Sequence, residues 1–152
     1  ESDNEDRDKY GDSYFQRRNP VTCEGLVQLT MGAPLPHYNG GLLVARLRYF
    51  DAQSKRSGLP SDVSALVTGM THTQTIVELA NLSKSEDRDV IIQAGAMSEN
   101  SFTKASFQSD ADIKTIKLND KYLQVHLPAY TNIKLDLRMQ RFVNMPSYKQ
   151  PT

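Results

Sequence analysis

The strongest constraint on the fold is a series of short segments in which apolar and polar side chains alternate. Alternation with a period of two is typical of β-strands that bury one face. Polar turns separate the candidate strands, which cover residues 42–50, 73–82, 90–94, 102–107, 113–118, 121–127 and 132–138, and the alternation is clearest in 42–50, 121–127 and 132–138. The pattern predicts an all-β chain that forms an antiparallel β-sandwich, of jelly-roll or immunoglobulin-like type.

Four segments allow a more detailed prediction. Both faces of residues 73–82 are apolar, which predicts a strand inside a sheet rather than at its edge. Segments 113–118 and 121–127 flank Asn119 and Asp120, a pair suited to a two-residue turn, so we expect a hairpin there. Residues 21–31 are a further candidate strand.

We expect one short helix near residues 61–69. Ser61 can cap its N-terminus, and Val63, Leu66 and Val67 would then share one helical face. A helix of two turns is stable only when it docks on another element.

The chain divides into three parts by composition. Residues 1–18 form an acidic stretch that we expect to be a flexible arm or linker. Residues 19–141 form the predicted sandwich, and residues 142–152, with two prolines, form an extended tail along the surface or against a partner. Because the first residue is Glu1 rather than Met, we expect a fragment of a larger protein.

Charge and cysteine content exclude several classes of function. Eighteen basic residues balance eighteen acidic ones, so we expect neither nucleic acid nor an anionic membrane as the main partner. No apolar run reaches the roughly 20 residues of a membrane helix. A lone Cys23 can form neither an internal disulfide nor a cysteine metal cage, and a buried structural role is favoured over a nucleophile.

No catalytic or metal-binding motif is present, so we predict a non-enzymatic chain without metal or cofactor. The three histidines are scattered, and His126 lies on the polar side of its segment. Asp110 and Asp112 offer too few ligands for calcium. Glu78 and Asp136 lie on separate strands, and only folding could bring them into one cleft for acid–base catalysis.

Two groups of residues are candidates for binding. His37, Tyr38 and Asn39 lie in a loop rich in proline and glycine, where an aromatic ring and two polar groups could contact a ligand. The alternative is a structural loop. Arg46, Arg48 and Phe50 form the second group because they project from one side of a strand. The alternative there is an ordinary solvated face.

Asn81 begins an Asn-Leu-Ser tripeptide that matches the N-glycosylation pattern, and we interpret it as a coincidence.

Two stretches of the sequence also resemble a known class of domain. The run from Thr75 to Ser83 leads through a polar turn to the run from Asp89 to Gly95, and the second stretch extends from Val125 to Leu135. Both are similar to the C-terminal accessory β-sandwich domains of bacterial multidomain carbohydrate-active enzymes. The resemblance covers about residues 73–138. It implies a domain that lacks the catalytic residues of its enzyme.

We therefore expect a non-catalytic β-sandwich module that packs against another domain or subunit of the same assembly. Two alternatives stay open. One is a structural subunit of a self-assembling surface or filament protein. The other is a polysaccharide-binding module, in which aromatic rings would form the sugar platform. The candidate rings are Tyr38, Tyr49, Tyr122 and Tyr130. We leave the compartment open, favouring an extracellular or periplasmic location over a cytoplasmic one.

Overall fold

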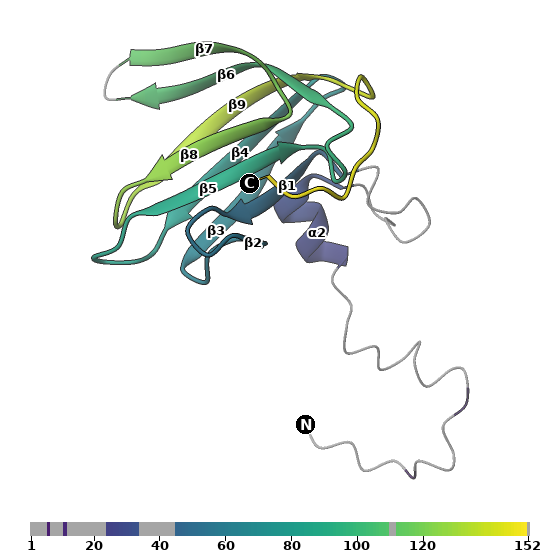
Figure 1. The fold of residues 1–152 in the computed structure, drawn as a ribbon. Coiled ribbons are helices and arrows are strands. Elements are labelled where there is room, and N and C mark those ends of the chain that lie inside the picture. Colours follow the sequence, from purple (N-terminus) through teal and green to yellow (C-terminus); the bar gives the residue numbers. More distant parts are fainter. Residues whose placement is uncertain (1–5, 7–10, 12–23, 34–44, 110–111, 152) are drawn as a thin grey trace.

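The computed structural model describes residues 6, 11, 24–33, 45–109 and 112–151, which form a two-layered β-sandwich with one short helix. The strands are β1 (Leu47–Asp51), β2 (Arg56–Ser57), β3 (Val63–Met70), β4 (Gln74–Asn81), β5 (Arg88–Ala94), β6 (Ser101–Ser109), β7 (Asp112–Asp120), β8 (Tyr122–Leu127) and β9 (Asn132–Gln140). The helix is α2 (Glu24–Met31). Figure 1 shows α2 beside the end of the sandwich that contains β1 and β3.

The strands form two antiparallel sheets. A four-stranded sheet has the order β2-β1-β5-β8, and a five-stranded sheet has the order β3-β4-β9-β6-β7. Their inner faces meet in one apolar core to which both sheets contribute. Its fully buried members include Leu47, Val77, Leu79, Val90, Ile92, Phe102 and Leu137. The sequence prediction of an antiparallel β-sandwich is therefore confirmed.

The alternation that predicted individual strands is also confirmed. In β4 every second residue is buried, and the intervening side chains are half-buried. The strand lies between β3 and β9, as its two apolar faces predicted. In β9, Leu135 and Leu137 point into the core. Burial of one face thus fixes which side of each strand turns inward.

The helix predicted near residues 61–69 is wrong, because residues 63–70 form strand β3. Val63 lies opposite Asn81, and the ladder continues to Met70 opposite Thr75. Val63 and Ala65 are buried while Ser64 and Leu66 are exposed. In so short a segment, apolar residues spaced for one helical turn also fit a strand, and pairing with β4 decides between the two.

The strand predicted for residues 21–31 is wrong as well, because residues 24–31 form helix α2. Val27 and Met31, four residues apart, pack against a small apolar cluster. Gly32 ends the helix with a φ of 65°, and its amide donates to the Gln28 carbonyl. The Tyr49 hydroxyl donates to the Thr30 carbonyl at 2.5 Å, which ties α2 to β1.

The hairpin predicted for residues 113–127 is the third correction, because its two arms belong to different sheets. Strand β7 pairs with β6, whereas β8 pairs with β5. The chain passes between the sheets at Lys121, whose carbonyl accepts a hydrogen bond from the Ala94 amide at 2.9 Å. Alternation identifies a strand but not its partner. Here β8 buries Val125 and Leu127 in the core, while β7 is exposed along nearly its whole length.

Candidate interaction site

The first group of predicted binding residues, His37, Tyr38 and Asn39, lies outside the described residues, as does Cys23. The second group lies on or beside β1. Phe50 is only 3% exposed, and the Arg48 guanidinium carbon lies 5.1 Å from the centre of its ring. The Phe50 ring is therefore a buried packing element and offers no surface to a ligand.

The two arginines beside it use their guanidinium groups within the fold. Arg46 donates to the carbonyls of Thr71 at 3.2 Å and His72 at 3.4 Å. Partial burial lowers the pKa of Arg46, and the nearby positive charge of Arg141 lowers it further. Arg48 donates to the Ala96 carbonyl at 3.3 Å. Both side chains connect β1 to loops.

The acidic and histidine candidates of the described residues pair with different partners. Glu78 and Asp136 lie on paired strands, β4 and β9, and on the same outer face. Each has another partner, because Glu78 pairs with Lys134 at 3.0 Å and Asp136 accepts a hydrogen bond from Gln74 at 2.8 Å. Folding brings the two carboxylates to neighbouring strands, but each contacts a different side chain.

His126 is exposed, and its two ring nitrogens face two carboxylates. Its Nδ1 lies 3.0 Å from Asp89, and its Nε2 lies 3.5 Å from Asp87. In the described part of the chain, no group of three histidine, cysteine, aspartate or glutamate residues could hold a metal ion. Asp112 is exposed, and Asp110 lies outside the described residues.

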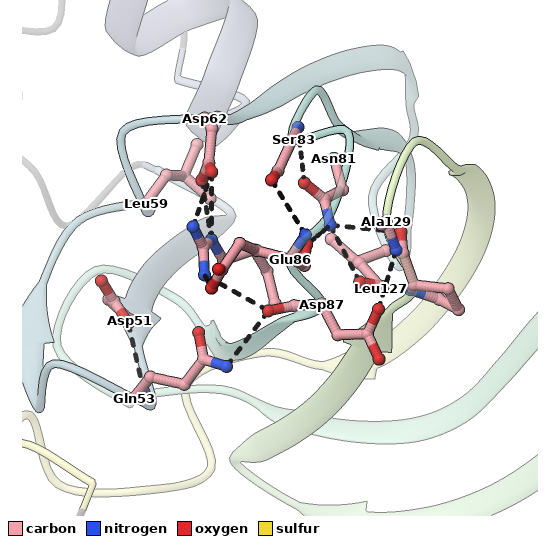
Figure 2. A network of polar contacts seen from close by, with 12 residues as sticks. Asp51, Gln53, Leu59, Asp62, Asn81, Ser83, Glu86, Asp87, Leu127 and Ala129 are labelled. Atoms are coloured by element: carbon pink, nitrogen blue, oxygen red, sulfur yellow. Dashed lines mark hydrogen bonds and ion pairs between the residues drawn. The ribbon is translucent and has the colours of Figure 1, made fainter.

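Asn81 has a structural role that sequence analysis missed. Figure 2 shows its side chain among the loops that connect β4 to β5 and β8 to β9. Its Nδ2 donates to the carbonyls of Glu86, Leu127 and Pro128, and its Oδ1 accepts from the Ser83 amide. The residue is 2% exposed, so the Asn-Leu-Ser tripeptide serves the fold.

The residues that follow β9, here called the C-terminal segment (residues 141–151), form neither helix nor strand. In Figure 1 this yellow segment leaves the end of β9 and turns back along the ends of the strands. Consistent with that path, the Tyr122 hydroxyl of β8 donates to the Lys149 carbonyl at 3.3 Å.

The backbone of the C-terminal segment is held by the loop of residues 95–101. The amides of Val143 and Asn144 donate to the Glu99 carbonyl at 3.0 and 3.1 Å. The Ser147 amide donates to the Met97 carbonyl at 2.7 Å. The Asn144 side chain donates to three further oxygens of that loop, the shortest contact being 2.8 Å. The segment is thus fixed at several points.

The large apolar side chains of this segment are nevertheless largely exposed to solvent. Their exposed fractions are 61% for Phe142, 52% for Val143, 87% for Met145 and 77% for Tyr148. We call these four residues the apolar patch. The sequence signal for it was weak, because the run from Phe142 to Tyr148 has no period that separates buried from exposed side chains.

Among the described tyrosines of the proposed sugar platform, Tyr130 is the most exposed. Tyr38 lies outside the described part, the Tyr49 ring is buried, and the Tyr122 hydroxyl is bonded to the C-terminal segment. Tyr130 is 76% exposed and adopts a φ of 54°, a left-handed conformation that is costly for a tyrosine.

Tyr130 lines the rim of a surface depression of about 520 Å³. Its other lining residues are Ala80, Asn81, Leu82, Thr131 and Asn132. Leu82 is 61% exposed beside it, and the Tyr130 amide donates to the Ser83 carbonyl at 2.8 Å, which holds the turn in place. The depression therefore combines an aromatic ring and an aliphatic side chain with polar groups.

Comparison with known proteins found no family model, no curated protein and no solved structure that matches this chain. The resemblance to accessory domains of carbohydrate-active enzymes therefore stays a prediction. No helix of the described residues is long and apolar enough to cross a membrane.

Proposed function

We propose that this β-sandwich is a non-catalytic contact module that packs against a partner domain or subunit through the apolar patch. The observation that carries the proposal is the contrast between backbone and side chains in the C-terminal segment. Its backbone is fixed to the 95–101 loop, while Met145 and Tyr148 remain 87% and 77% exposed. Clustered exposed apolar side chains are characteristic of interaction surfaces.

The fixed backbone favours binding for an energetic reason. Association costs conformational entropy whenever flexible groups become ordered. Here hydrogen bonds to Glu99 and Met97 have already ordered the segment, so a partner needs to restrain only the side chains. Tyrosine and methionine are both favoured in the buried centre of interfaces.

The test is sedimentation velocity over a range of protein concentrations, with a fluorescent apolar dye as a second probe. We expect the wild-type chain to associate and to bind the dye. The double variant Met145→Ser/Tyr148→Ser should weaken association by at least about tenfold, because truncating an anchor residue at the centre of an interface costs about 2 kcal/mol or more.

The matched control is Ile113→Ser, which removes an apolar side chain of similar exposure, 76%, on β7. It should change neither association nor dye binding. A wild-type chain that stays monomeric at every concentration, and binds dye as strongly as the double variant does, would refute the proposal.

The Tyr130 depression supports polysaccharide binding as a second candidate function. One face of a pyranose ring is apolar and stacks on an aromatic side chain, while its hydroxyl groups need hydrogen-bonding partners. Tyr130 and Leu82 provide the apolar surface, and the exposed Asn132 provides a carboxamide at the rim. The strained backbone of an exposed tyrosine is also more common at functional positions.

Gel retardation by soluble neutral polysaccharides tests this second candidate. We expect retardation by at least one of xylan, galactomannan and mixed-linkage glucan. Tyr130→Ala should abolish it, Tyr130→Phe should preserve it, and Tyr148→Ala, which removes an equally exposed tyrosine, should leave it unchanged. If none of the three polymers retards the wild-type chain, this candidate is excluded.

A further inference from the structure

Strands β7, β6 and β9 are neighbours in the five-stranded sheet (Figure 1). Their register brings three cationic residues side by side on the outer face of this sheet. Lys104 of β6 is directly opposite Lys117 of β7 and directly opposite Arg138 of β9. Since neighbouring strands are about 4.8 Å apart, the three residues span roughly 10 Å. We call them the cation row.

The three charges of this row repel one another, and no described residue forms an ion pair with them. Like charges directly opposite each other destabilise a sheet. None of the three side chains forms a hydrogen bond or ion pair with a described residue. On the same face Glu78 pairs with Lys134, and Asp136 accepts from Gln74 through Oδ2 while its Oδ1 has no hydrogen-bond partner.

A β-bulge places Lys104 in the row. The register shifts between Phe102 and Lys104 against both neighbouring strands. Against β9 the extra residue is Thr103, whereas against β7 the extra residue lies on β7, between Lys117 and Asp120. Strict alternation from the buried Phe102 would turn Lys104 toward the core, but the irregularity gives the next buried position to Ala105 and leaves Lys104 on the outer face. Bulges commonly redirect a side chain in this way. The local backbone is therefore built to bring a third cation beside Lys117 and Arg138.

Protection of a sheet edge explains only part of the row. Lysines on an edge strand discourage pairing with another chain, and β7 is an edge strand. That accounts for Lys117. It does not account for Lys104 or Arg138, whose strands are flanked on both sides.

We propose that the cation row binds an acidic segment of a partner polypeptide, whose carboxylates accept charge-assisted hydrogen bonds from Lys104, Lys117 and Arg138. Charge complementarity carries the proposal. It goes beyond the apolar contact proposed above and does not depend on it.

Other anionic partners fit the row less well. Nucleic-acid binding usually engages about six to ten phosphates, and membrane recognition usually needs about four to eight clustered basic residues. A saccharide site would need an aromatic ring. The residues in register beside the row on this face are Gln74, Ser106, Thr115 and Asp136, none of them aromatic.

The experiment measures fluorescence anisotropy of a labelled extended peptide with alternating Glu and Ser, titrated with the full chain. The same peptide with Gln in place of Glu is the ligand control. We expect only the acidic peptide to bind. Binding should disappear as ionic strength rises from about 0.01 M to about 1 M, because the Debye length falls from about 30 Å to about 3 Å.

Single variants locate the binding site. Lys104→Gln, Lys117→Gln and Arg138→Gln should each raise the Kd by at least about fivefold. Lys114→Gln is the matched control, because Lys114 is an exposed lysine on β7 that points to the opposite face. It should leave the Kd unchanged.

Urea unfolding separates binding from a structural role. Lys104→Gln should raise the midpoint, because it relieves repulsion on both sides while it weakens binding. The proposal is overturned by no binding of the acidic peptide, or by an equal effect of Lys114→Gln. It is also overturned if heparin or vesicles of anionic lipid bind through the row and the peptide does not.

Discussion

Arg88 of β5 holds Asp62, the residue just before β3, through paired hydrogen bonds across the two sheets. Its Nε lies 2.9 Å from Asp62 Oδ1, and its Nη2 lies 2.7 Å from Oδ2. The two side chains are only 21% and 26% exposed. A planar, two-point contact of this kind fixes orientation as well as distance. The contact connects the residue before β3, an edge strand of the five-stranded sheet, to β5, an inner strand of the four-stranded sheet.

The first prediction is that the Arg88–Asp62 pair makes the free energy of unfolding depend on pH in the acidic range. The hydrogen bonds from Arg88 lower the pKa of Asp62 below its usual value. A carboxyl whose pKa is lower in the folded state stabilises the protein above its unfolded pKa of about 3.9, and that contribution is lost as pH falls through the folded pKa. Asp62→Asn should therefore lower the urea midpoint at neutral pH.

The difference between wild type and Asp62→Asn should vanish once the pH lies below the folded pKa of Asp62. Urea unfolding at a series of pH values measures it. A difference that stays constant from neutral to strongly acidic pH would contradict a role for the charge of Asp62.

The second prediction concerns Gly95, which begins the loop that holds the C-terminal segment. Its φ is 87°, and a Cβ there would overlap the carboxylate of the buried Glu99. That carboxylate accepts the Met97 amide at 2.8 Å, so it cannot move freely. Gly95→Ala should cost about 1–2 kcal/mol for the backbone and a further 1–3 kcal/mol for the overlap.

Gly58→Ala is the matched control for Gly95→Ala. Gly58 also has a positive φ, 97°, but an added Cβ would meet only the end of the Arg56 side chain at 3.9 Å. Gly58→Ala should therefore lower the free energy of unfolding only by the backbone contribution of about 1–2 kcal/mol. Equal free energies of unfolding for the two variants would show that Glu99 does not restrict the site.

The third prediction is that Tyr130 lowers the stability of the fold. Relief of its left-handed backbone in Tyr130→Gly should raise the free energy of unfolding by about 0.5–1 kcal/mol. Denaturant unfolding checks the sign. Asn132→Gly, next to the same turn but with no positive φ recorded, should instead lower stability. A loss of stability in Tyr130→Gly would mean that the ring has a structural function.

The fourth prediction concerns Asn81. Asn81→Ala should lower the free energy of unfolding by about 1–3 kcal/mol, because it removes the donor to the carbonyls of Glu86 and Pro128 in two separate loops. Asn132→Ala removes an exposed asparagine on the adjacent strand and should have a much smaller effect. Thermal or urea unfolding measures both. Similar values would place Asn81 outside the stabilising network.

The sequence predicted strands best where one face is buried along the whole segment. In β4 and β9 the core selects the same side at every second residue, so local pattern and tertiary burial agree. The prediction failed for β3 and α2. Each has only eight residues, too few to distinguish the helical period of about 3.6 residues from the strand period of two.

Partner choice and function depend on contacts that alternation does not encode. The separation of β7 from β8 at Lys121 follows from which strand completes the core. The apolar patch depends on hydrogen bonds from residues 142–147 to a loop about forty-five residues earlier in the chain. A local sequence pattern therefore does not predict it. Likewise, Lys104 lies opposite Arg138 only because of the register between β6 and β9, which includes the bulge at Thr103.

Oxidative footprinting of Met145 tests the contact module most directly. Peroxide converts exposed methionine to its sulfoxide, and mass spectrometry locates it. In the dilute chain, Met145 at 87% exposure should react faster than Met70 at 46%. At concentrations where the chain associates, we predict that Met145 becomes protected while Met70 reacts as before. Protection of Met70 alone, or of neither residue, would contradict an interface built on the C-terminal segment.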